Sequence, residues 1–192
     1  MLGLKLETDP RWVNIVEKNI SEILTDHAYC EQKAASNAIT IIVKYPEFPD
    51  LVKEMCAIAQ EEMQHFEMVH DKILERGFEL GFERKDPYVN DLRAFLPKGG
   101  SRMTQLTHRL LFAAMIEARS CERFKILSEE ISDPDLKSFY RELMISEANH
   151  YTTFISFARK YGEGDVDAIW QQFLEFEAGL MRKYGKKETI HG

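Results

Sequence analysis

The chain has 192 residues and a formal net charge of −7, with 44% hydrophobic and 30% charged residues. This length suits one domain, which would bury roughly 70% of the surface that its unfolded chain exposes. The composition excludes a low-complexity disordered protein, and the acidic balance argues against a generally basic nucleic-acid binder while leaving room for a local basic patch.

Long stretches between sparse prolines and glycines predict helices, and no alternating apolar run is long enough for a strand. A first helix is expected from Asp9 and Pro10, a cap residue followed by proline in the first turn, to about Lys44. A second helix is expected over about 49–76, with Gly77 as its C-cap.

Residues 78–100 contain three glycines and two prolines, and they are expected to form a long crossover loop. A third helix is expected over about 101–131 and a fourth over about 133–162. A shorter fifth helix is expected over about 165–184, with its inward face formed by Val166, Ile169, Phe173, Phe176 and Leu180.

This order is hairpin, long crossover, hairpin, and one more helix. Short links make each helix pair antiparallel neighbours, and a single long crossover is how ferritin-like bundles are connected. We therefore expect an all-α fold: a ferritin-like four-helix bundle with one long crossover and an additional C-terminal helix. The expected domain covers 1–184, and 185–192 form a C-terminal tail.

Two of the expected helices carry a Glu-x-x-His motif on the core stripe, where only apolar residues should lie. The motifs are Glu62 with His65 and Glu147 with His150. Residues three apart on a helix have Cβ atoms about 5–6 Å apart, so each pair can bind one metal ion.

The motif alone is a weak signal, because the chain matches it four times. Glu67 and His70 lie on a polar face that we expect to be solvated. Glu188 and His191 fall in a tail that we expect to be frayed. Only position on the core stripe separates the first two matches from these.

The first and third helices each place a lone acid, Glu31 or Glu117, on the same kind of stripe. Glu31 precedes Glu62 by 31 residues, and Glu117 precedes Glu147 by 30. Each acid or motif thus lies about 15 residues from its inter-helix turn, or about 22 Å at 1.5 Å per residue. The spacing therefore predicts that four Glu and two His converge at mid-bundle.

Four buried carboxylates need a cation, because a buried unpaired charge shifts its pKa or finds a partner. Two divalent metals offset much of that charge. One Glu from each of two helices and Glu-x-x-His from each of the other two is the ligand set of di-iron and di-manganese carboxylate bundles. Carboxylate and imidazole suit iron or manganese, and these ligands alone leave that choice open.

Three further residues lie near the expected centre. His27, one turn before Glu31, either orients that ligand or is a hydrogen-bonded core histidine. Cys30 and Cys121 flank the site, and we interpret them as small buried hydrophobes rather than ligands. The three cysteines of the chain include no C-x-x-C pair, which argues against a disulfide scaffold or a zinc ribbon.

Four segments resemble the tRNA 2-methylthio-N6-isopentenyladenosine hydroxylase family, MiaE. They are HAYCEQKAAS (27–36), AQEEMQHFEMV (59–69), IEARSCERF (116–124) and SEANHY (146–151). The first and third are distinctive beyond the general ferritin-like pattern.

The resemblance implies a non-haem di-iron monooxygenase that uses O2 and two electrons to hydroxylate the isopentenyl group of the modified adenosine in the tRNA anticodon stem-loop. The implied ligands to the two Fe ions are Glu31, Glu62, His65, Glu117, Glu147 and His150. No catalytic residue beyond the metal centre is expected. The electrons must come from an external reductase, since the chain has no flavin or nicotinamide fingerprint.

A tRNA partner needs phosphate contacts from Lys or Arg. The candidates in and after the crossover are Arg84, Lys85, Arg93, Lys98 and Arg102, and those toward the C-terminus are Arg182, Lys183, Lys186 and Lys187. Either these residues guide the anticodon stem, or they are an ordinary solvated loop and tail.

Two other functions stay open on the residues alone. A ferritin-like peroxidase, catalase or ferroxidase would share the fold and the di-iron or di-manganese centre. A metal-free helical interaction protein would tolerate apolar replacement of the six residues. We expect a monomer or small homo-oligomer that is soluble, cytoplasmic and not bound to a membrane, because no apolar run reaches the length of a membrane span.

Overall fold

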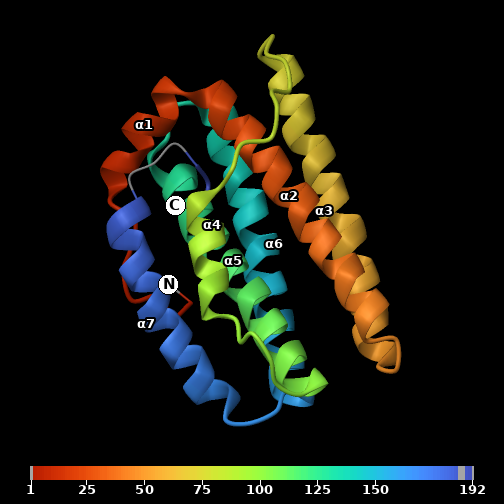
Figure 1. Ribbon diagram of the computed structural model, residues 1–192. Coiled ribbons are helices and arrows are strands. Elements are labelled where there is room, and N and C mark those ends of the chain that lie inside the picture. Colours follow the sequence, from red (N-terminus) through yellow and green to blue (C-terminus); the bar gives the residue numbers. More distant parts are fainter. Residues whose placement is uncertain (1, 186–188, 192) are drawn as a thin grey trace. The chain divides into compact units, whose positions relative to one another are not determined.

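The computed structural model describes residues 2–185 and 189–191, and every regular element in them is helical. The helices are α1 (Val13–Lys18), α2 (Ile20–Lys44), α3 (Pro49–Glu75), α4 (Pro87–Leu92), α5 (Arg102–Glu130), α6 (Pro134–Tyr161) and α7 (Val166–Tyr184), with 3-10 turns η1 (Pro10–Trp12) and η2 (Arg93–Phe95) (Figure 1). The prediction of an all-α fold is confirmed.

The chain divides into two compact units. Unit 1 comprises Met1–Lys18 and Asp86–Gly192, and unit 2 comprises Asn19–Lys85. The expected single domain over 1–184 stays a prediction.

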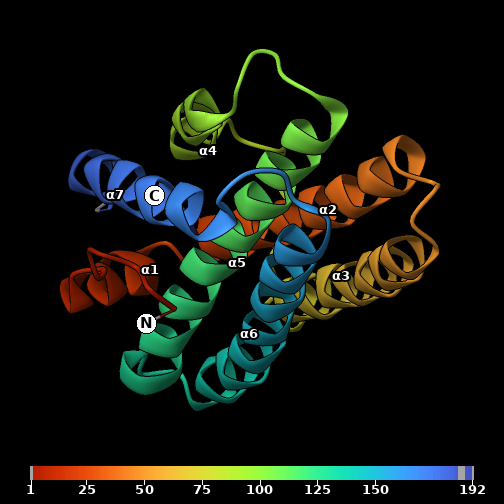
Figure 2. The same cartoon turned by 90° about the horizontal axis from the view of Figure 1, so that it is seen from below.

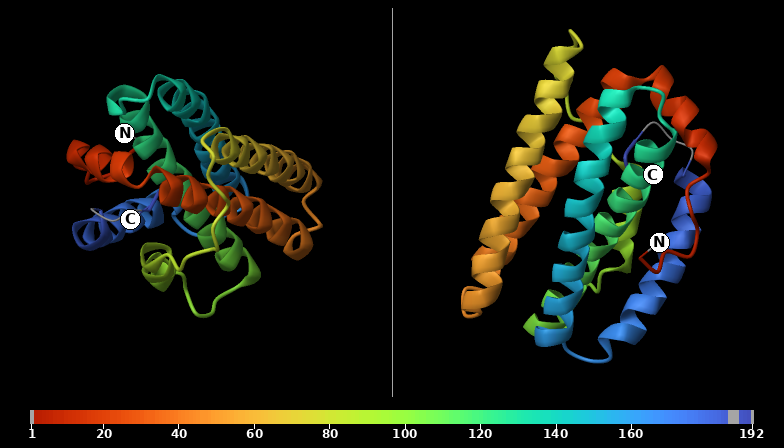
Figure 3. Two further views of the ribbon diagram at one scale, coloured as in Figure 1. Left: turned by 90° about the horizontal axis from the view of Figure 1, so that it is seen from above. Right: turned by 180° about the vertical axis from the view of Figure 1, so that it is seen from behind.

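Unit 2 is an antiparallel hairpin of α2 and α3 (Figure 3). Gly77 ends the hairpin's second helix with φ of 71°, in the left-handed region that favours glycine. The Gly77 N–H donates to the Leu74 carbonyl at 2.9 Å and the Phe78 N–H to the Ile73 carbonyl at 3.0 Å. These two bonds form a Schellman motif, so the predicted second helix and its glycine cap are both present.

The expected first helix is wrong in one respect: it is broken at Asn19, whose φ of −138° and ψ of 39° are not helical. Asparagine is a weak helix former, and the break falls where the chain passes from unit 1 to unit 2. Trp12 and Val16 before it are buried in unit 1, and the Arg123 guanidinium lies 4.2 Å from the centre of the Trp12 ring. The apolar stripe continues through Ile20, so the spacing of apolar residues does not reveal the helix break at Asn19.

Unit 1 is built around α5, which pairs with α6 and has α1 and α7 on its other side (Figure 2). All eight residues over 117–124 are buried. Ser101 caps the start of α5, its hydroxyl accepting the Thr104 N–H at 3.0 Å. Asp133 caps α6 in the same way through the Asp135 and Leu136 N–H groups. These caps fix where the second pair of helices begins.

The crossover is not the plain loop that was expected. It contains α4, whose N-cap Asp86 accepts the Val89 N–H at 3.1 Å, with Pro87 in the first turn. Tyr88 and Leu92 are fully buried, and α4 packs on α7. Asp86 followed by Pro87 is a helix-start signature. The number of glycines and prolines over 78–100 favoured a loop instead.

The expected inward face of α7 is also partly wrong, because Ile169, Phe176 and Leu180 are only half-buried. α7 packs against α4, α5 and α6, so it buries a wide face that turns away from the expected stripe. That face consists of Val166, Trp170, Phe173, Leu174, Glu177, Ala178, Met181 and Tyr184.

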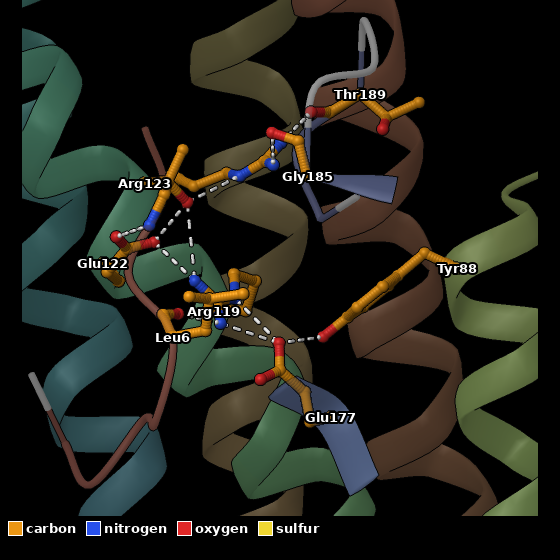
Figure 4. A network of polar contacts seen from close by, with 9 residues as sticks. Leu6, Tyr88, Arg119, Glu122, Arg123, Glu177, Gly185 and Thr189 are labelled. Carbon is orange, nitrogen blue, oxygen red and sulfur yellow. Dashed lines mark hydrogen bonds and ion pairs between the residues drawn. The ribbon is translucent and has the colours of Figure 1, made fainter. Parts of the chain in front are cut away.

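A buried polar network joins α5 to α7, α4 and the N-terminal segment (Figure 4). Arg119 donates to Glu122 Oε2 at 2.8 Å and to Glu177 Oε1 at 2.7 Å, while the Tyr88 hydroxyl donates to the same Glu177 oxygen at 2.8 Å. Burial, reinforced by the Glu177 charge, raises the pKa of Tyr88 well above its usual value, so the phenol stays a donor.

The second arginine of the network, Arg123, is fully buried and donates to the Thr189 carbonyl at 2.6 Å and to the Gly185 carbonyl at 3.2 Å (Figure 4). Burial, helped by repulsion from Arg119, lowers the Arg123 pKa to about 10, which still leaves it charged at neutral pH. The described end of the chain is therefore bound to α5.

The expectation that His191 is frayed is wrong, because its side chain is only 3% exposed. Its Nε2 lies 3.1 Å from the Ser120 hydroxyl, its Nδ1 lies 3.6 Å from Asp86 Oδ2, and its ring stacks on Tyr88. Burial works to raise the Asp86 pKa, but the close approach and charge of His191 prevail and lower it. Glu188, Lys186 and Lys187 lie outside the described residues.

Replacing Arg119 tests how far unit 1 depends on the network. Arg119→Met leaves Glu122 and Glu177 buried without their cation, so we expect a loss of about 3–5 kcal/mol in the free energy of unfolding. Urea denaturation followed by circular dichroism measures it. Lys125→Met, at an exposed position of the same helix, should change stability by no more than about 0.5 kcal/mol. Equal effects of the two variants would contradict this account.

Candidate metal centre

In unit 2, α2 supplies Glu31 and α3 supplies Glu62 and His65. All three are buried, and their possible ligand atoms lie within 4.8 Å of one another. His65 Nδ1 lies 3.4 Å from Glu62 Oε2 and 3.9 Å from Glu31 Oε2. The structure thus brings together two carboxylates and one imidazole that are up to 34 residues apart in the sequence. We call this set the α2–α3 triad.

Two further side chains, His27 and Glu61, lie next to the α2–α3 triad. His27, fully buried one turn before Glu31, places its Nε2 2.6 Å from Glu31 Oε1. On the other side of the His65 ring, Nε2 lies 3.9 Å from Glu61 Oε1. A histidine ligand usually offers its second ring nitrogen to a carboxylate, which fixes the ring and its tautomer. The sequence singled out His27 but missed Glu61, although adjacent acids at 61 and 62 were visible.

In unit 1, α5 supplies Glu117 and α6 supplies Glu147 and His150. These three side chains are also buried, and their possible ligand atoms lie within 4.8 Å of one another. The local pattern therefore repeats that of unit 2: one Glu from the first helix of a pair and Glu-x-x-His from the second. We call this set the α5–α6 triad.

The two cysteines expected near the centre differ in surroundings. Cys121 is buried, and its thiol donates to the Met144 carbonyl at 3.3 Å. Burial, reinforced by the Glu147 charge, raises the Cys121 pKa to about 12, so the group is a neutral thiol at physiological pH. Cys30 is half-buried. A thiol that keeps its proton is a poor metal ligand, in agreement with the interpretation of Cys121 as a small buried hydrophobe.

The chemistry of each triad fits a hard or borderline divalent metal. Two carboxylates and an imidazole in a buried site are ligands that iron and manganese accept, and none of the six residues is a thiolate, which zinc favours in structural sites. Buried carboxylates so close together repel one another, and a divalent cation removes that repulsion.

The other Glu-x-x-His matches behave differently from the two on the core stripe. Glu67 is exposed, and His70 is half-buried with its ring stacked on Phe66. The expectation of a solvated face is confirmed for Glu67. His191 has the structural role described above, which no spacing of the motif could have shown.

Those of the proposed tRNA-contacting basic residues that lie in the described part of the chain are at the surface. Arg84 and Lys85 are exposed in unit 2, and Arg93, Lys98 and Arg102 are exposed in unit 1. Of the C-terminal candidates, Arg182 and Lys183 are exposed, and Lys183 pairs with Asp91 at 3.0 Å.

Among the helices that the structure describes, none combines the length and the apolar character that crossing a membrane requires.

A family model matches the chain over residues 2–192, and its description is tRNA-(MS[2]IO[6]A)-hydroxylase (MiaE). A Pseudomonas putida protein is 36% identical over 96% of this chain and 89% of its own length. A Salmonella typhimurium protein is 27% identical over 91% of this chain and 81% of its own length. Both relatives are named tRNA 2-(methylsulfanyl)-N(6)-isopentenyladenosine(37) hydroxylase.

A solved structure described as protein 43 with aldehyde deformylating oxygenase activity, from Synechococcus, is similar with a TM-score of 0.86 and 29% identity. The likeness covers 98% of this chain and 95% of that one. The match extends over both hairpins and the crossover, and it supports the ferritin-like arrangement expected from the connections.

Proposed function

The chain belongs to the MiaE family of tRNA hydroxylases, and on that premise we propose that it inserts one oxygen atom from O2 into the isopentenyl group of 2-methylthio-N6-isopentenyladenosine in tRNA. The balanced reaction takes a C–H bond, O2, two electrons and two protons to a C–OH group and water. The observation that carries the proposal is the repeated triad of two carboxylates and one histidine, buried in each helix pair.

We further propose that the α2–α3 and α5–α6 triads together hold two iron ions, with manganese as the alternative. The equal spacing of the six residues from their hairpin turns supports this assignment, as does the pattern shared by the two triads. When bound, the metal pair would supply the activation of O2 that no amino-acid side chain provides.

The chain's own residues prepare the site. His27 fixes the position of Glu31 through a contact of 2.6 Å, and Glu61 faces the outer nitrogen of His65. The thiol of Cys121, held to the Met144 carbonyl, places an uncharged group beside Glu147. Burial of the six ligands keeps bulk water from the reacting centre and limits side reactions.

Mass spectrometry of tRNA nucleosides tests the function. Purified protein reconstituted with iron, given a reductant and O2, should add one oxygen to 2-methylthio-N6-isopentenyladenosine in tRNA. Glu117→Ala should abolish the gain, because it removes a ligand from the α5–α6 triad. Absence of the gain in a protein that holds two metals per chain would favour the alternative of a peroxidase, catalase or ferroxidase.

Metal content tests the ligand assignment separately from activity. Glu62→Ala with His65→Ala should lower bound iron from two per chain to one or none, measured by inductively coupled plasma mass spectrometry. The matched control is Glu67→Ala with His70→Ala, which changes the same motif on the surface of the same helix. Unchanged metal content in the first variant would refute the assignment.

Charge reversal tests the tRNA surface. Arg93, Lys98 and Arg102 changed together to Glu should weaken tRNA binding and flatten its salt dependence, because phosphate contacts release counterions. Fluorescence anisotropy at several salt concentrations gives both quantities. The control reverses the exposed residues Lys53, Lys125 and Arg141, which changes the net charge equally. Binding that falls equally in both variants would indicate a general charge effect.

The proposal also includes an external reductase as the electron donor, a cytoplasmic location beside the tRNA pool, and a monomer or small homo-oligomer.

A further inference from the structure

Phe82 is 94% exposed, more than any other exposed large hydrophobic residue in the described part of the chain. It lies in unit 2, in the extended segment that follows α3. An isolated surface aliphatic residue needs no explanation. A phenylalanine with nearly its whole ring in water is different, because burying an aromatic side chain is worth more than burying a smaller one.

The segment is held against α2 on both sides of Phe82, by the Gly81 backbone before the ring and by the Arg84 side chain after it. The Tyr29 hydroxyl donates to the Gly81 carbonyl at 3.0 Å, and the Gly81 N–H donates to the Thr25 hydroxyl at 3.4 Å. A Cβ at position 81 would come within 3.3 Å of the Thr25 methyl group, so glycine permits this close approach. Beyond the ring, the Arg84 guanidinium donates to the Glu22 carbonyl at 3.3 Å.

These contacts mean that Phe82 is presented to solvent by an anchored segment. A loose loop could fold the ring back onto the apolar surface. Here Gly81 on one side and Arg84 on the other are both bonded to α2, which restricts that movement. The exposure of the ring is therefore a property of the fold.

Two exposed cations, Arg84 and Lys85, follow the ring within three residues of the chain. The carboxylate of Glu83 pairs with Lys33 at 2.9 Å, which raises the Lys33 pKa against the effect of burial and lowers the Glu83 pKa. Glu83 is therefore paired, and the exposed acid that remains near the ring in the chain is Glu79, on the other side of Phe82 from Arg84 and Lys85. The segment thus combines one projecting aromatic ring with two cations in a protein of net charge −7.

We propose that Phe82 is an RNA contact that stacks on an unpaired base of the tRNA anticodon loop, with Arg84 and Lys85 holding the adjacent phosphates. The inference rests on the proposed function, which supplies a tRNA substrate. Proteins recognise RNA loops by stacking splayed-out bases on aromatic rings and by binding the backbone with cations. A ring anchored on both sides suits this role, because little of its freedom is lost on binding.

An acidic electron-donor protein is the other partner that cations could attract. A protein interface typically buries about 800 Å² per partner around an apolar core. Phe82 is one ring flanked by charged and small residues, so a single stacked base fits it better. The experiment distinguishes the two partners.

Binding of tRNA to the iron-loaded protein, measured by fluorescence anisotropy, should weaken about fivefold to a hundredfold in Phe82→Ala. The slope of affinity against salt should not change, because no phosphate contact is lost. Phe82→Trp should bind as tightly as the parent protein or more tightly. Lys85→Gln should also weaken binding but, unlike Phe82→Ala, should reduce the salt slope by about one. Val43→Ala, at a residue 72% exposed in the same unit, is the matched control and should bind normally.

Unchanged affinity in Phe82→Ala overturns the inference, and so does an equal loss in Val43→Ala. In a third outcome, Phe82→Ala binds tRNA normally but reacts more slowly, and only when a reductase protein replaces the chemical reductant. That outcome would assign Phe82 to a contact with the electron donor instead. Oxygen insertion by the parent protein is measured in the same samples. If the parent hydroxylates tRNA and Phe82→Ala still binds normally, the inference fails and the proposed function stands.

Discussion

Burial of carboxylates is the constraint on which the rest of the molecule depends. Each helix pair holds two buried Glu beside one His, and unit 1 buries Glu122 and Glu177 as well. A buried carboxylate is stable only with a cation or several donors nearby. The chain meets this need with arginine in the polar network, where Arg119 contacts both Glu122 and Glu177. In the triads we propose that metal ions take the same role.

The arginine network and the proposed metal ligand occupy opposite faces of α5. Glu117, a proposed ligand, and Arg119, the centre of the network, are two residues apart and so point about 200° apart around the helix. The network binds α5 to α4, α7, the N-terminal segment and the described end of the chain. One face thus fixes the helix in unit 1, and the other carries the proposed ligand Glu117. This explains why a stretch of eight consecutive residues is buried although it contains two Glu and two Arg.

The sequence predicted the long helices well because their caps and stripes are local signals. The Asp133 cap, the Gly77 cap and the two Glu-x-x-His motifs on core stripes could all be read without a structure. The break at Asn19 and the buried His191 could not, whereas α4 had a visible start signal in Asp86 and Pro87 but no signal for the surface on which it packs. Each depends on which distant surface a segment packs against, as His191 does on Ser120 and Asp86. Likewise, the spacing indicated the triads, but nothing in it could identify Glu61 as the partner of His65.

A negatively charged protein that acts on a polyanion must concentrate its cations locally. In the segment after α3, Arg84 and Lys85 follow Phe82 within three residues, and the intervening Glu83 is paired with Lys33. The same ion pair helps to hold the segment on α2, so it affects both the local charge and the rigidity of the segment. Affinity from phosphates alone carries no sequence information, whereas a stacked ring requires an unpaired base at a fixed place. A rigid aromatic contact beside a small cationic surface therefore favours a loop over a duplex, which is the kind of RNA in which a modified adenosine next to the anticodon is found.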